Sequence, residues 1–225
     1  MKILITGTSS GIGKATLEHL REVGHDVRGI SGHSELDVSK REKVRAYALS
    51  LRQEGWIPNV LILNAGIFPD DVRPDFNREV LDKVFAVNVG GAINFIAEFL
   101  PNLLANKGQV IGIASVAAWR SNLRGIAYPA SKAALARILE GFDLHYRRRG
   151  VAFSTVYLGP TATRMWEGKQ SFVVASPEAV ARMLEKLTRS RKSKVYFPIF
   201  ATLLVRILIL IPDGLYLHMR KYLLK

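Results

Sequence analysis

Two side chains in the middle of the chain have the types and the spacing needed for proton transfer. Tyr128 and Lys132 are four residues apart, so on a helix they lie on the same face, one turn from each other. A free tyrosine has a pKa near ~10, and a cation close by stabilises the phenolate and lowers that value. By itself the pair is more typical of packing and solvent contact. Ser115, thirteen residues before Tyr128, adds a hydroxyl that could orient a substrate oxygen.

A glycine-rich segment near the N-terminus has the composition of a phosphate site. Thr6–Gly13 reads Thr-Gly-Thr-Ser-Ser-Gly-Ile-Gly and lies between an expected strand and an expected helix. Glycines permit a tight turn and a close backbone approach, and a helix N-terminus supplies free N–H groups and a positive dipole end. Three glycines could also serve only to form a turn, but their position between a strand and a helix favours a dinucleotide-binding site. The residues that we expect to bind its diphosphate are Gly7, Ser9, Ser10, Gly11, Ile12 and Gly13.

The elements that must position these groups alternate between short apolar runs and longer amphipathic stretches. The apolar runs predict strands at Lys2–Thr6, Asp26–Ile30, Val60–Leu63, Gln109–Ala114, Val151–Tyr157 and Val195–Pro198. The amphipathic stretches predict helices at Ile12–Val23, Lys40–Gln53, Glu79–Ala105, Tyr128–Arg149 and from Pro177 to about Thr188. This alternation predicts an α/β fold, a doubly wound parallel sheet of the Rossmann type with crossover helices.

Six motifs in the expected order resemble the short-chain dehydrogenase/reductase (SDR) family. They are Thr6–Gly13, Asn64-Ala65-Gly66, Asn88, Ser115, Tyr128-x-x-x-Lys132 and Gly159–Thr163. The resemblance covers residues 6–163 well and the tail poorly. It implies an NAD(P)-dependent enzyme that moves a hydride between a nicotinamide cofactor and a carbonyl or alcohol.

The resemblance also implies roles for the catalytic residues. Tyr128 would be the general acid in reduction and the base in oxidation, and Ser115 would donate to the substrate oxygen. Lys132 would hold the nicotinamide ribose and depress the Tyr128 pKa, so Tyr128 and Lys132 also count as cofactor contacts. Asn88 would interrupt its helix and hold a water that relays protons to Lys132. A buried structural amide is the alternative for Asn88.

Further cofactor contacts follow from the same resemblance. Asn64–Gly66 would let backbone pass close to the adenine ribose, and Thr161 and Thr163 would reach the nicotinamide carboxamide and the diphosphate. Asp37 and Val38 resemble the pair of residues that contacts adenine. The alternative is that Asp37 caps the helix that follows it.

The end of the second strand bears on the choice between NADP and NAD. This strand ends in Ile30-Ser31-Gly32-His33 and carries no acid, which would accept hydrogen bonds from both ribose hydroxyls of NAD. A small residue such as Ser31 would tolerate a 2′-phosphate, and His33, Arg28 and Lys14 could add positive potential. We therefore predict NADP, with NAD as the alternative.

The C-terminal part differs from the rest in charge and hydropathy. Residues 146–225 hold 15 Lys/Arg and 4 Asp/Glu, whereas residues 1–145 hold 17 and 15. Ile199–Ile211 is almost wholly apolar but too short for a confident membrane span, which needs ~20 apolar residues. Asp213–Lys225 is expected to form a second, amphipathic helix. We predict a catalytic domain at 1–198 and a helical tail at 199–225 that contacts an anionic membrane surface. A homodimer or core helix is the alternative.

A tail on a membrane would favour an apolar substrate, such as a fatty aldehyde, a long-chain ketone, or a retinoid-like or steroid-like carbonyl. Trp119, Arg120, Met165 and Trp166 are candidates for the substrate pocket, with loop packing as an equal alternative. The competing function is a non-catalytic NAD(P)-binding sensor or scaffold, which would not need Ser115, Tyr128 and Lys132. A sugar epimerase or dehydratase is less favoured, because the short chain leaves no room for a large sugar-binding domain.

Other residue types exclude several classes of site. The absence of cysteine excludes disulfides, thiolate nucleophiles and thiolate metal sites. The five histidines show no metal-ligand spacing, so no metal site is expected. The net charge of +13 could attract nucleic acid, but no recognition module accompanies it. The first residues lack the long apolar run of a signal peptide, so we expect a cytoplasmic protein, peripheral at a membrane if the tail contacts lipid.

Overall fold

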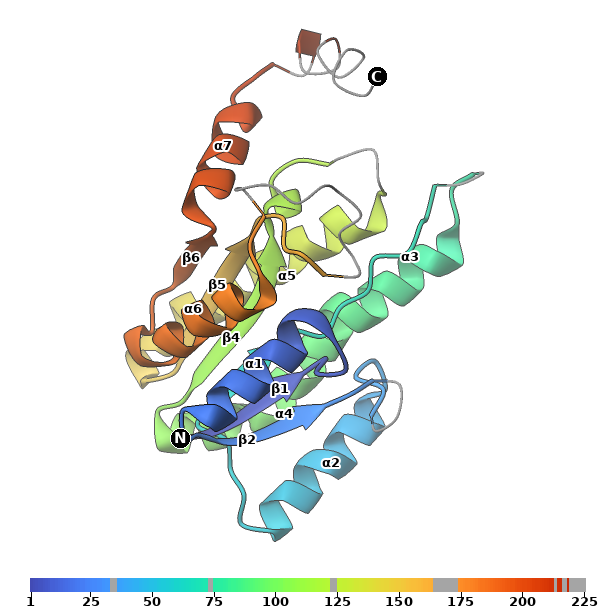
Figure 1. Ribbon diagram of the computed structural model, residues 1–225. Coiled ribbons are helices and arrows are strands. Elements are labelled where there is room, and N and C mark those ends of the chain that lie inside the picture. Colours follow the sequence, from blue (N-terminus) through green and yellow to red (C-terminus); the bar gives the residue numbers. More distant parts are fainter. Residues whose placement is uncertain are drawn as a thin grey trace.

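In the computed structural model a six-stranded parallel sheet forms the centre of the molecule (Figure 1). The structure describes residues 1–32, 36–72, 75–121, 125–163, 174–212, 214, 215 and 218. The strands are β1 (Lys2–Thr6), β2 (Asp26–Ile30), β3 (Val60–Leu63), β4 (Gln109–Ser115), β5 (Ala152–Leu158) and β6 (Lys194–Phe197). They pair in the order β2-β1-β3-β4-β5-β6, all in parallel. The predicted doubly wound α/β fold is confirmed.

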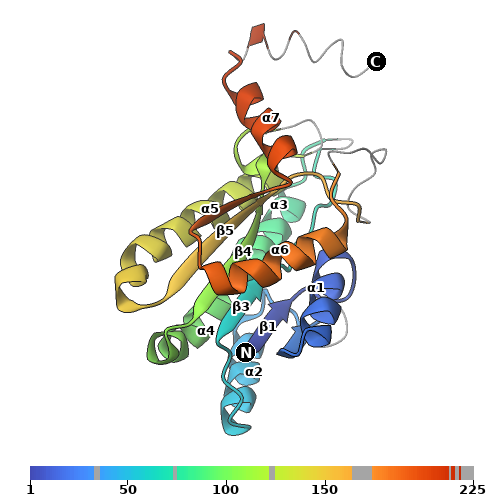
Figure 2. The same cartoon turned by 60° about the vertical axis from the view of Figure 1, so that its left-hand side comes forward.

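Helices cover both faces of the sheet (Figures 1 and 2). One face carries α1 (Gly11–Glu22) and α6 (Pro177–Ser190), and the other carries α2 (Arg41–Gln53), α4 (Gly91–Asn106) and α5 (Ala127–Tyr146). Successive side chains of a strand point to opposite faces, so Ile3 and Ile5 pack with α1 and α6, while Leu4 packs in the other core. This double burial explains why the strands are apolar throughout.

The long helical region predicted at Glu79–Ala105 consists of three parts. These are α3 (Arg78–Phe85), a π-helical turn η1 (Ala86–Gly90) and α4. The continuous run Arg78–Asn106 is long and apolar enough to cross a membrane by length and composition alone. Phe95, Phe99 and Leu103 are fully buried against the sheet, which is the packing of a core helix.

The helix α7 (Ile199–Ile209) projects beyond the end of β6 (Figures 1 and 2). Two arginines attach it to the body. Arg120 Nη1 donates to the carbonyl oxygens of Leu208 at 2.8 Å and Ile211 at 3.1 Å. Arg206 lies over the rings of Trp119 and Tyr196, at 5.6 and 5.0 Å from their centres. The second tail helix predicted over Asp213–Lys225 falls almost entirely outside the described residues, and the boundary at residue 198 remains a prediction.

The strand order determines where a ligand can bind. The chain leaves β1 for β2 on one side and later returns to β3 on the other side of β1. In an open parallel sheet, such a reversal opens a crevice beyond the carboxyl ends of the strands. The glycine-rich segment follows β1 and the Asn64–Gly66 motif follows β3, so both lie at this crevice.

Candidate active site

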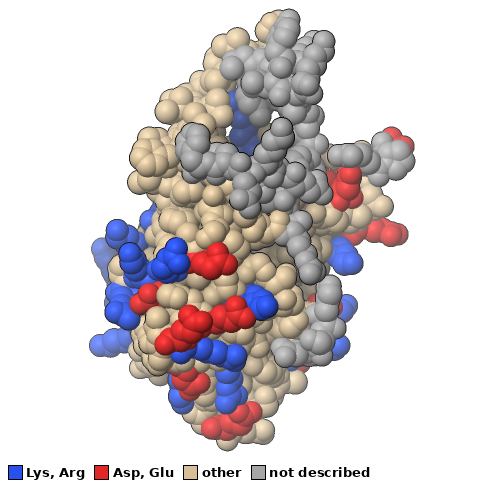
Figure 3. Space-filling model, in the orientation of Figure 1, with Lys and Arg blue, Asp and Glu red and all other residues tan. Residues whose placement is uncertain are grey.

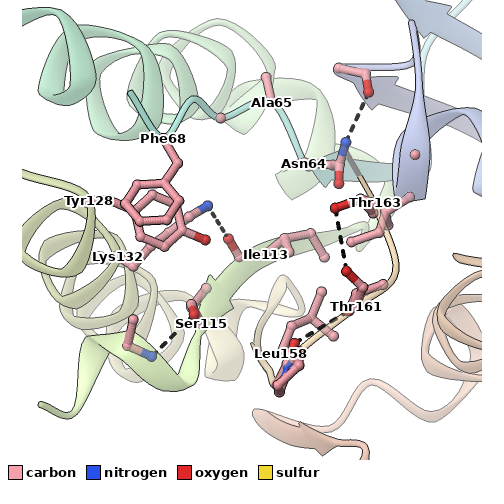
Figure 4. A pocket seen from close by; sticks show the side chains of 18 of the residues that line it. Asn64, Ala65, Phe68, Ile113, Ser115, Tyr128, Lys132, Leu158, Thr161 and Thr163 are labelled. Carbon is pink, nitrogen blue, oxygen red and sulfur yellow. Dashed lines mark hydrogen bonds between the residues drawn. The ribbon is translucent and has the colours of Figure 1, made fainter. Parts of the chain in front are cut away.

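A cavity of about 420 Å³ opens at the carboxyl ends of the strands (Figure 4). Its walls come from the turn between β1 and α1, the ends of β3, β4 and β5, and the first turns of α5. Most of the predicted site residues line it: Gly7, Ser9, Ser10, Gly11, Ile12, Asn64, Ala65, Gly66, Ser115, Tyr128, Lys132, Thr161 and Thr163. Motifs that are far apart in the sequence therefore meet in one place.

The start of α1 forms one wall of the cavity. Ser10 is its N-cap but makes no side-chain cap bond, and the first turn holds no acidic residue. Free N–H groups at a helix start suit an anion. A Cβ at Gly13 would overlap Gly7 O and come within 2.6 Å of Asn64 Nδ2. Gly13 therefore does not line the cavity; it lets α1 pack tightly behind the turn.

The opposite wall presents Tyr128 and Lys132 from the first turns of α5 (Figure 4). Lys132 Nζ lies 5.6 Å from the centre of the Tyr128 ring and donates to Ile113 O at 2.7 Å. The ring of Phe68 packs on that of Tyr128, with the ring centres 4.5 Å apart. The helical spacing thus brings the two groups together as predicted.

Burial shifts the pKa of both groups. Desolvation lowers the Lys132 pKa to about 8. Desolvation raises the Tyr128 pKa above its usual value, and a hydrogen bond with the Ser115 side chain opposes this change. The pKa of Tyr128 is thus raised overall, because burial disfavours the phenolate more strongly than Ser115 stabilises it. That Lys132 depresses the Tyr128 pKa remains a prediction.

Ser115 stands at the end of β4, next to Tyr128. Its Oγ accepts a hydrogen bond from Ala117 N at 3.1 Å and so caps the short 3₁₀ turn Val116–Ala118. That bond fixes the hydroxyl at the cavity wall, where the Ser115 side chain lowers the Tyr128 pKa. Two hydroxyls therefore face the same space, which is the arrangement needed to bind one oxygen atom of a substrate.

Asn88 lies in the π turn η1 and is buried, with 1% exposed. Its Nδ2 donates to Ile67 O at 3.1 Å and to Ser131 Oγ at 3.0 Å, and its Oδ1 accepts from Ile67 N at 2.8 Å. The predicted interruption of the helix is present. These contacts favour the alternative that the side chain is a structural amide, and the proton relay remains a prediction.

Three predicted cofactor contacts, Ser31, Asp37 and Val38, lie away from the lining of the cavity. Asp37 Oδ1 accepts from Ser39 N at 2.9 Å and from Ser39 Oγ at 2.7 Å, and this side-chain bond is the main cause of its lowered pKa. Asp37 therefore forms a turn just before α2, which favours the alternative of a cap. Val38 is buried against Gly91. Their contacts with adenine remain predictions.

The basic residues proposed to attract a 2′-phosphate differ in their surroundings. Arg28 Nη1 pairs with Glu54 at 2.6 Å, and its guanidinium lies over Trp56. Lys14 is exposed and lies 3.7 Å from Glu18. His33 is outside the described residues. Arg28 is thus engaged by Glu54 and Trp56, and Lys14 is the more accessible of the two described residues.

Of the predicted substrate residues, Trp119 and Arg120 hold α7 and do not line the cavity. Trp119 packs on Tyr157 and Tyr196, with ring centres 5.0 and 5.7 Å away. Loop packing is therefore the better interpretation for both. Met165 and Trp166 lie outside the described residues.

Some lining residues were missed by the sequence analysis. They are Phe68, Ile113, Ala114, Val116, Ala117 and Leu158, whereas Gly159 and Pro160 also line the cavity and belong to the predicted Gly159–Thr163 motif. Each one stands at or just beyond the carboxyl end of β3, β4 or β5. Their position after a predicted strand was the available signal, since that edge of a parallel sheet holds the ligand site.

Comparison with known proteins finds similar sequences. The family model described as short chain dehydrogenase matches residues 32–173. An uncharacterized oxidoreductase of Listeria monocytogenes is 30% identical over 182 residues, which cover 71% of this chain and 73% of the relative. Another, YvrD of Bacillus subtilis, is 28% identical over 200 residues, 80% of this chain and 74% of the relative.

Solved structures have the same architecture. A short chain dehydrogenase from Burkholderia cenocepacia in complex with NADP has a TM-score of 0.80 and 27% identity, covering 97% of this chain and 96% of that chain. A 4-hydroxyisoleucine dehydrogenase complexed with NADH has a TM-score of 0.79 and 22% identity, covering 87% and 96%. The first similarity extends over nearly the whole chain.

Proposed function

The chain belongs to the short-chain dehydrogenase family and is an NAD(P)-dependent oxidoreductase, and we propose that it interconverts a carbonyl and an alcohol through Tyr128, Ser115 and Lys132. One observation carries this proposal. The Tyr128 and Ser115 side chains both line the cavity, where Ser115 lowers the Tyr128 pKa, and the Lys132 ammonium lies beside the Tyr128 ring. A module that only binds a nucleotide has no use for this set, so a sensor or scaffold is not favoured.

The residues fit a nicotinamide dinucleotide. The uncapped start of α1 offers N–H groups to a diphosphate, and the tight packing at Gly13 keeps that helix end close to β1. Thr161 and Thr163, at the end of β5, line the same cavity from the other side. When bound, the cofactor supplies or accepts the hydride.

The side chains divide the remaining chemistry among them. Ser115 donates to the carbonyl oxygen and orients it. Tyr128 gives its proton to that oxygen in reduction and takes it back in oxidation. The cationic Lys132 stabilises the phenolate that Tyr128 becomes, and its hydrogen bond to Ile113 O fixes the ammonium in place. The phenol is protonated at neutral pH, since even an unperturbed tyrosine has a pKa near ~10, so it can donate its proton in reduction.

A steady-state assay tests the proposal. NADPH and NADH oxidation would be followed with aldehydes and ketones of increasing chain length, and NADP⁺ and NAD⁺ reduction with the matching alcohols. Turnover with a chain-length optimum is the expected result. Cofactor binding without turnover in either direction, also with lipid present, would instead support the sensor or scaffold.

We propose NADP as the preferred cofactor. Support comes from Ser31, the first residue after β2, where an acid would be needed to bind both ribose hydroxyls of NAD. Lys14, exposed in the first turn of α1, adds a nearby positive charge.

We further propose that the substrate is apolar and that α7 contacts an anionic membrane surface. An apolar substrate is supported by seven non-polar residues that line the cavity: Phe68, Ile113, Ala114, Val116, Ala117, Leu158 and Pro160. The exposed apolar side chains of α7 support the second point: Ile199, Phe200, Leu203, Leu204, Ile207 and, at its C-cap, Leu210. In Figure 3 the surface of α7 is almost free of charge, while charged side chains gather on the lower half of the same view. A second copy of the chain is the competing occupant.

A further inference from the structure

A buried carboxylate in the loop after β3 lies at the N-terminus of the helix that carries Tyr128. Asp71 is only 1% exposed. Its two oxygens accept from Ile126 N at 3.0 and 3.1 Å, and Oδ2 also accepts from Ala127 N at 2.5 Å. The N-cap residue of α5, Ile126, provides no side-chain cap. Asp71 therefore caps α5 from a different segment of the chain.

The position of this cap determines where Tyr128 lies. The two N–H groups held by Asp71 belong to the residues directly before Tyr128, so a shift of the cap moves the tyrosine backbone. A carboxylate at a helix N-terminus is also favoured by the helix dipole. Gly125 lets the chain pass close by, because a Cβ there would come within 2.7 Å of Asp71 Oδ1.

The same loop also contacts the ring of Tyr128. Phe68 packs on that ring, with a centre-to-centre distance of 4.5 Å (Figure 4). The loop is fixed at its start, because Asn88 bonds both the N–H and the carbonyl oxygen of Ile67. The segment from Ile67 to Asp71 therefore holds Tyr128 both by its ring and by the backbone before it.

We propose that Asp71 is a positioning residue for the proton donor, acting through the N-terminus of α5. This inference rests on the proposed role of Tyr128. A displacement of about 1 Å in a catalytic group can reduce a rate by about a hundredfold. The loss of the cap should therefore reduce kcat much more than it reduces cofactor affinity.

A matched control exists on the same helix. Asp143, near the far end of α5, is also a buried carboxylate, and it accepts from Phe153 N at 2.9 Å, from Ser193 Oγ at 2.8 Å and from Arg147. It lies outside the lining of the cavity. Asp71→Asn and Asp71→Ala would be compared with Asp143→Asn. The Asn side chain retains one oxygen that can accept a hydrogen bond. Asp71→Asn should therefore still fold if Asp71→Ala does not.

The variants would be measured by kcat, by the Kd for NADPH and by Tm. We expect kcat to fall about tenfold in Asp71→Asn and about a hundredfold in Asp71→Ala, with the Kd for NADPH within about threefold of the original. Asp143→Asn should lower Tm and leave kcat unchanged. An unchanged kcat in Asp71→Asn would overturn the proposal. So would a fall in kcat that is in the same proportion to the fall in Tm in Asp71→Asn and in Asp143→Asn.

A second measurement does not depend on turnover. Amide hydrogen exchange should become faster at residues 126–128 in Asp71→Asn and remain unchanged there in Asp143→Asn. Unchanged exchange at these residues would overturn the positioning role. If exchange becomes faster but the protein turns over no carbonyl, Asp71 still caps α5 and the proposed function of Tyr128 is rejected. A failure of the positioning role and a failure of the proposed function therefore give different results.

Discussion

At the residue scale, the site combines a phenol that resists ionisation with an ammonium that is easily neutralised. Burial causes both effects, because it disfavours the charged form of each group. The sequence predicted Ser115, Tyr128 and Lys132 as neighbours, because their spacing and order are local features. It could not predict that Phe68 and Asp71 contact the start of α5, since those contacts depend on how a distant loop packs.

The buried Lys132 should reduce stability at neutral pH. Its pKa is about 8 in the fold and about 10.4 when unfolded, so between these values the unfolded chain binds more protons and stability rises with pH. Lys132→Met should therefore raise the free energy of unfolding at pH 7 by about 1–2 kcal/mol, after the lost bond to Ile113 O is allowed for. Urea denaturation at pH 7 and 9.5 measures this gain, which should shrink at the higher pH.

Lys194→Met is the control for this experiment. The hydrogen bond to Glu140 raises the Lys194 pKa. The contribution of this pair to stability is therefore fully present below the pKa of Lys194 in the unfolded chain and is lost only at higher pH. The Lys194→Met effect should be nearly the same at pH 7 and 9.5. A Lys132→Met effect that is equally independent of pH would contradict the account of Lys132.

Ser31 should decide between the two cofactors. Ser31→Asp would place a carboxylate where the 2′-phosphate of NADP is expected, and like charges repel. We expect the ratio of the Kd values for NADPH and NADH to shift towards NADH by tenfold or more. Ser31→Asn has the same size without the charge and should shift the ratio far less. Equal shifts in the two variants would exclude a charge effect at this position.

At the element scale, periodicity predicted the strands well, whereas the interruption of the long helix at Asn88 was predicted only through the family resemblance. Apolar runs bounded by polar residues define β1, β2 and β3 with the bounds that the structure gives. The division of the long helix into α3, η1 and α4 is stabilised by Asn88, which bonds Ile67 in another segment. Only the family resemblance indicated an interruption there, because helical periodicity continues through the turn.

The close contact between α1 and the turn after β1 can be tested by a substitution that adds one methyl group. In Gly13→Ala the new Cβ would overlap Gly7 O, so the start of α1 must move away. We expect NADPH binding to be lost and Tm to fall. Isothermal titration and thermal unfolding measure the two effects.

Gly141→Ala is the matched control for this substitution. It lies in α5, and a Cβ there would meet nothing within 4 Å. It should bind NADPH normally and gain about 0.5–1 kcal/mol from helix propensity. Normal binding in Gly13→Ala would mean that α1 does not have to pack against Gly7 to hold the cofactor.

At the scale of the whole molecule, the strand order places the glycine turn and the Asn64–Gly66 motif on either side of one crevice. The sequence predicted this arrangement through the alternation of strands and helices. The attachment of α7 was not predicted, because Arg120 bonds Leu208 of α7, and Arg206 of α7 contacts Trp119, across distant parts of the chain. The tail is therefore fastened to the segment that follows Ser115.

The apolar surface of α7 predicts association with lipid. The full chain should sediment with vesicles that contain phosphatidylserine, and less with pure phosphatidylcholine. The double variant Phe200→Ser and Leu204→Ser should lose this association, because both side chains are exposed on α7. Leu144→Ser, which changes an exposed leucine on α5, should retain it.

Two results would contradict the lipid contact. One is a wild-type chain that does not sediment with either kind of vesicle. The other is a concentration-dependent dimer that the double variant abolishes, which would assign this surface to a second copy of the chain.

The central claim is that Tyr128 transfers the proton, and its substitution is the most direct test. Tyr128→Phe removes only the hydroxyl, and Tyr157→Phe does the same at a tyrosine outside the cavity lining. The measurement is the rate of NADPH oxidation by the best aldehyde of the chain-length series. The account predicts a loss of about 10²–10⁴-fold in Tyr128→Phe, with NADPH binding retained and Tyr157→Phe near the wild-type rate. A Tyr128→Phe enzyme that reduces the aldehyde at the wild-type rate would contradict it.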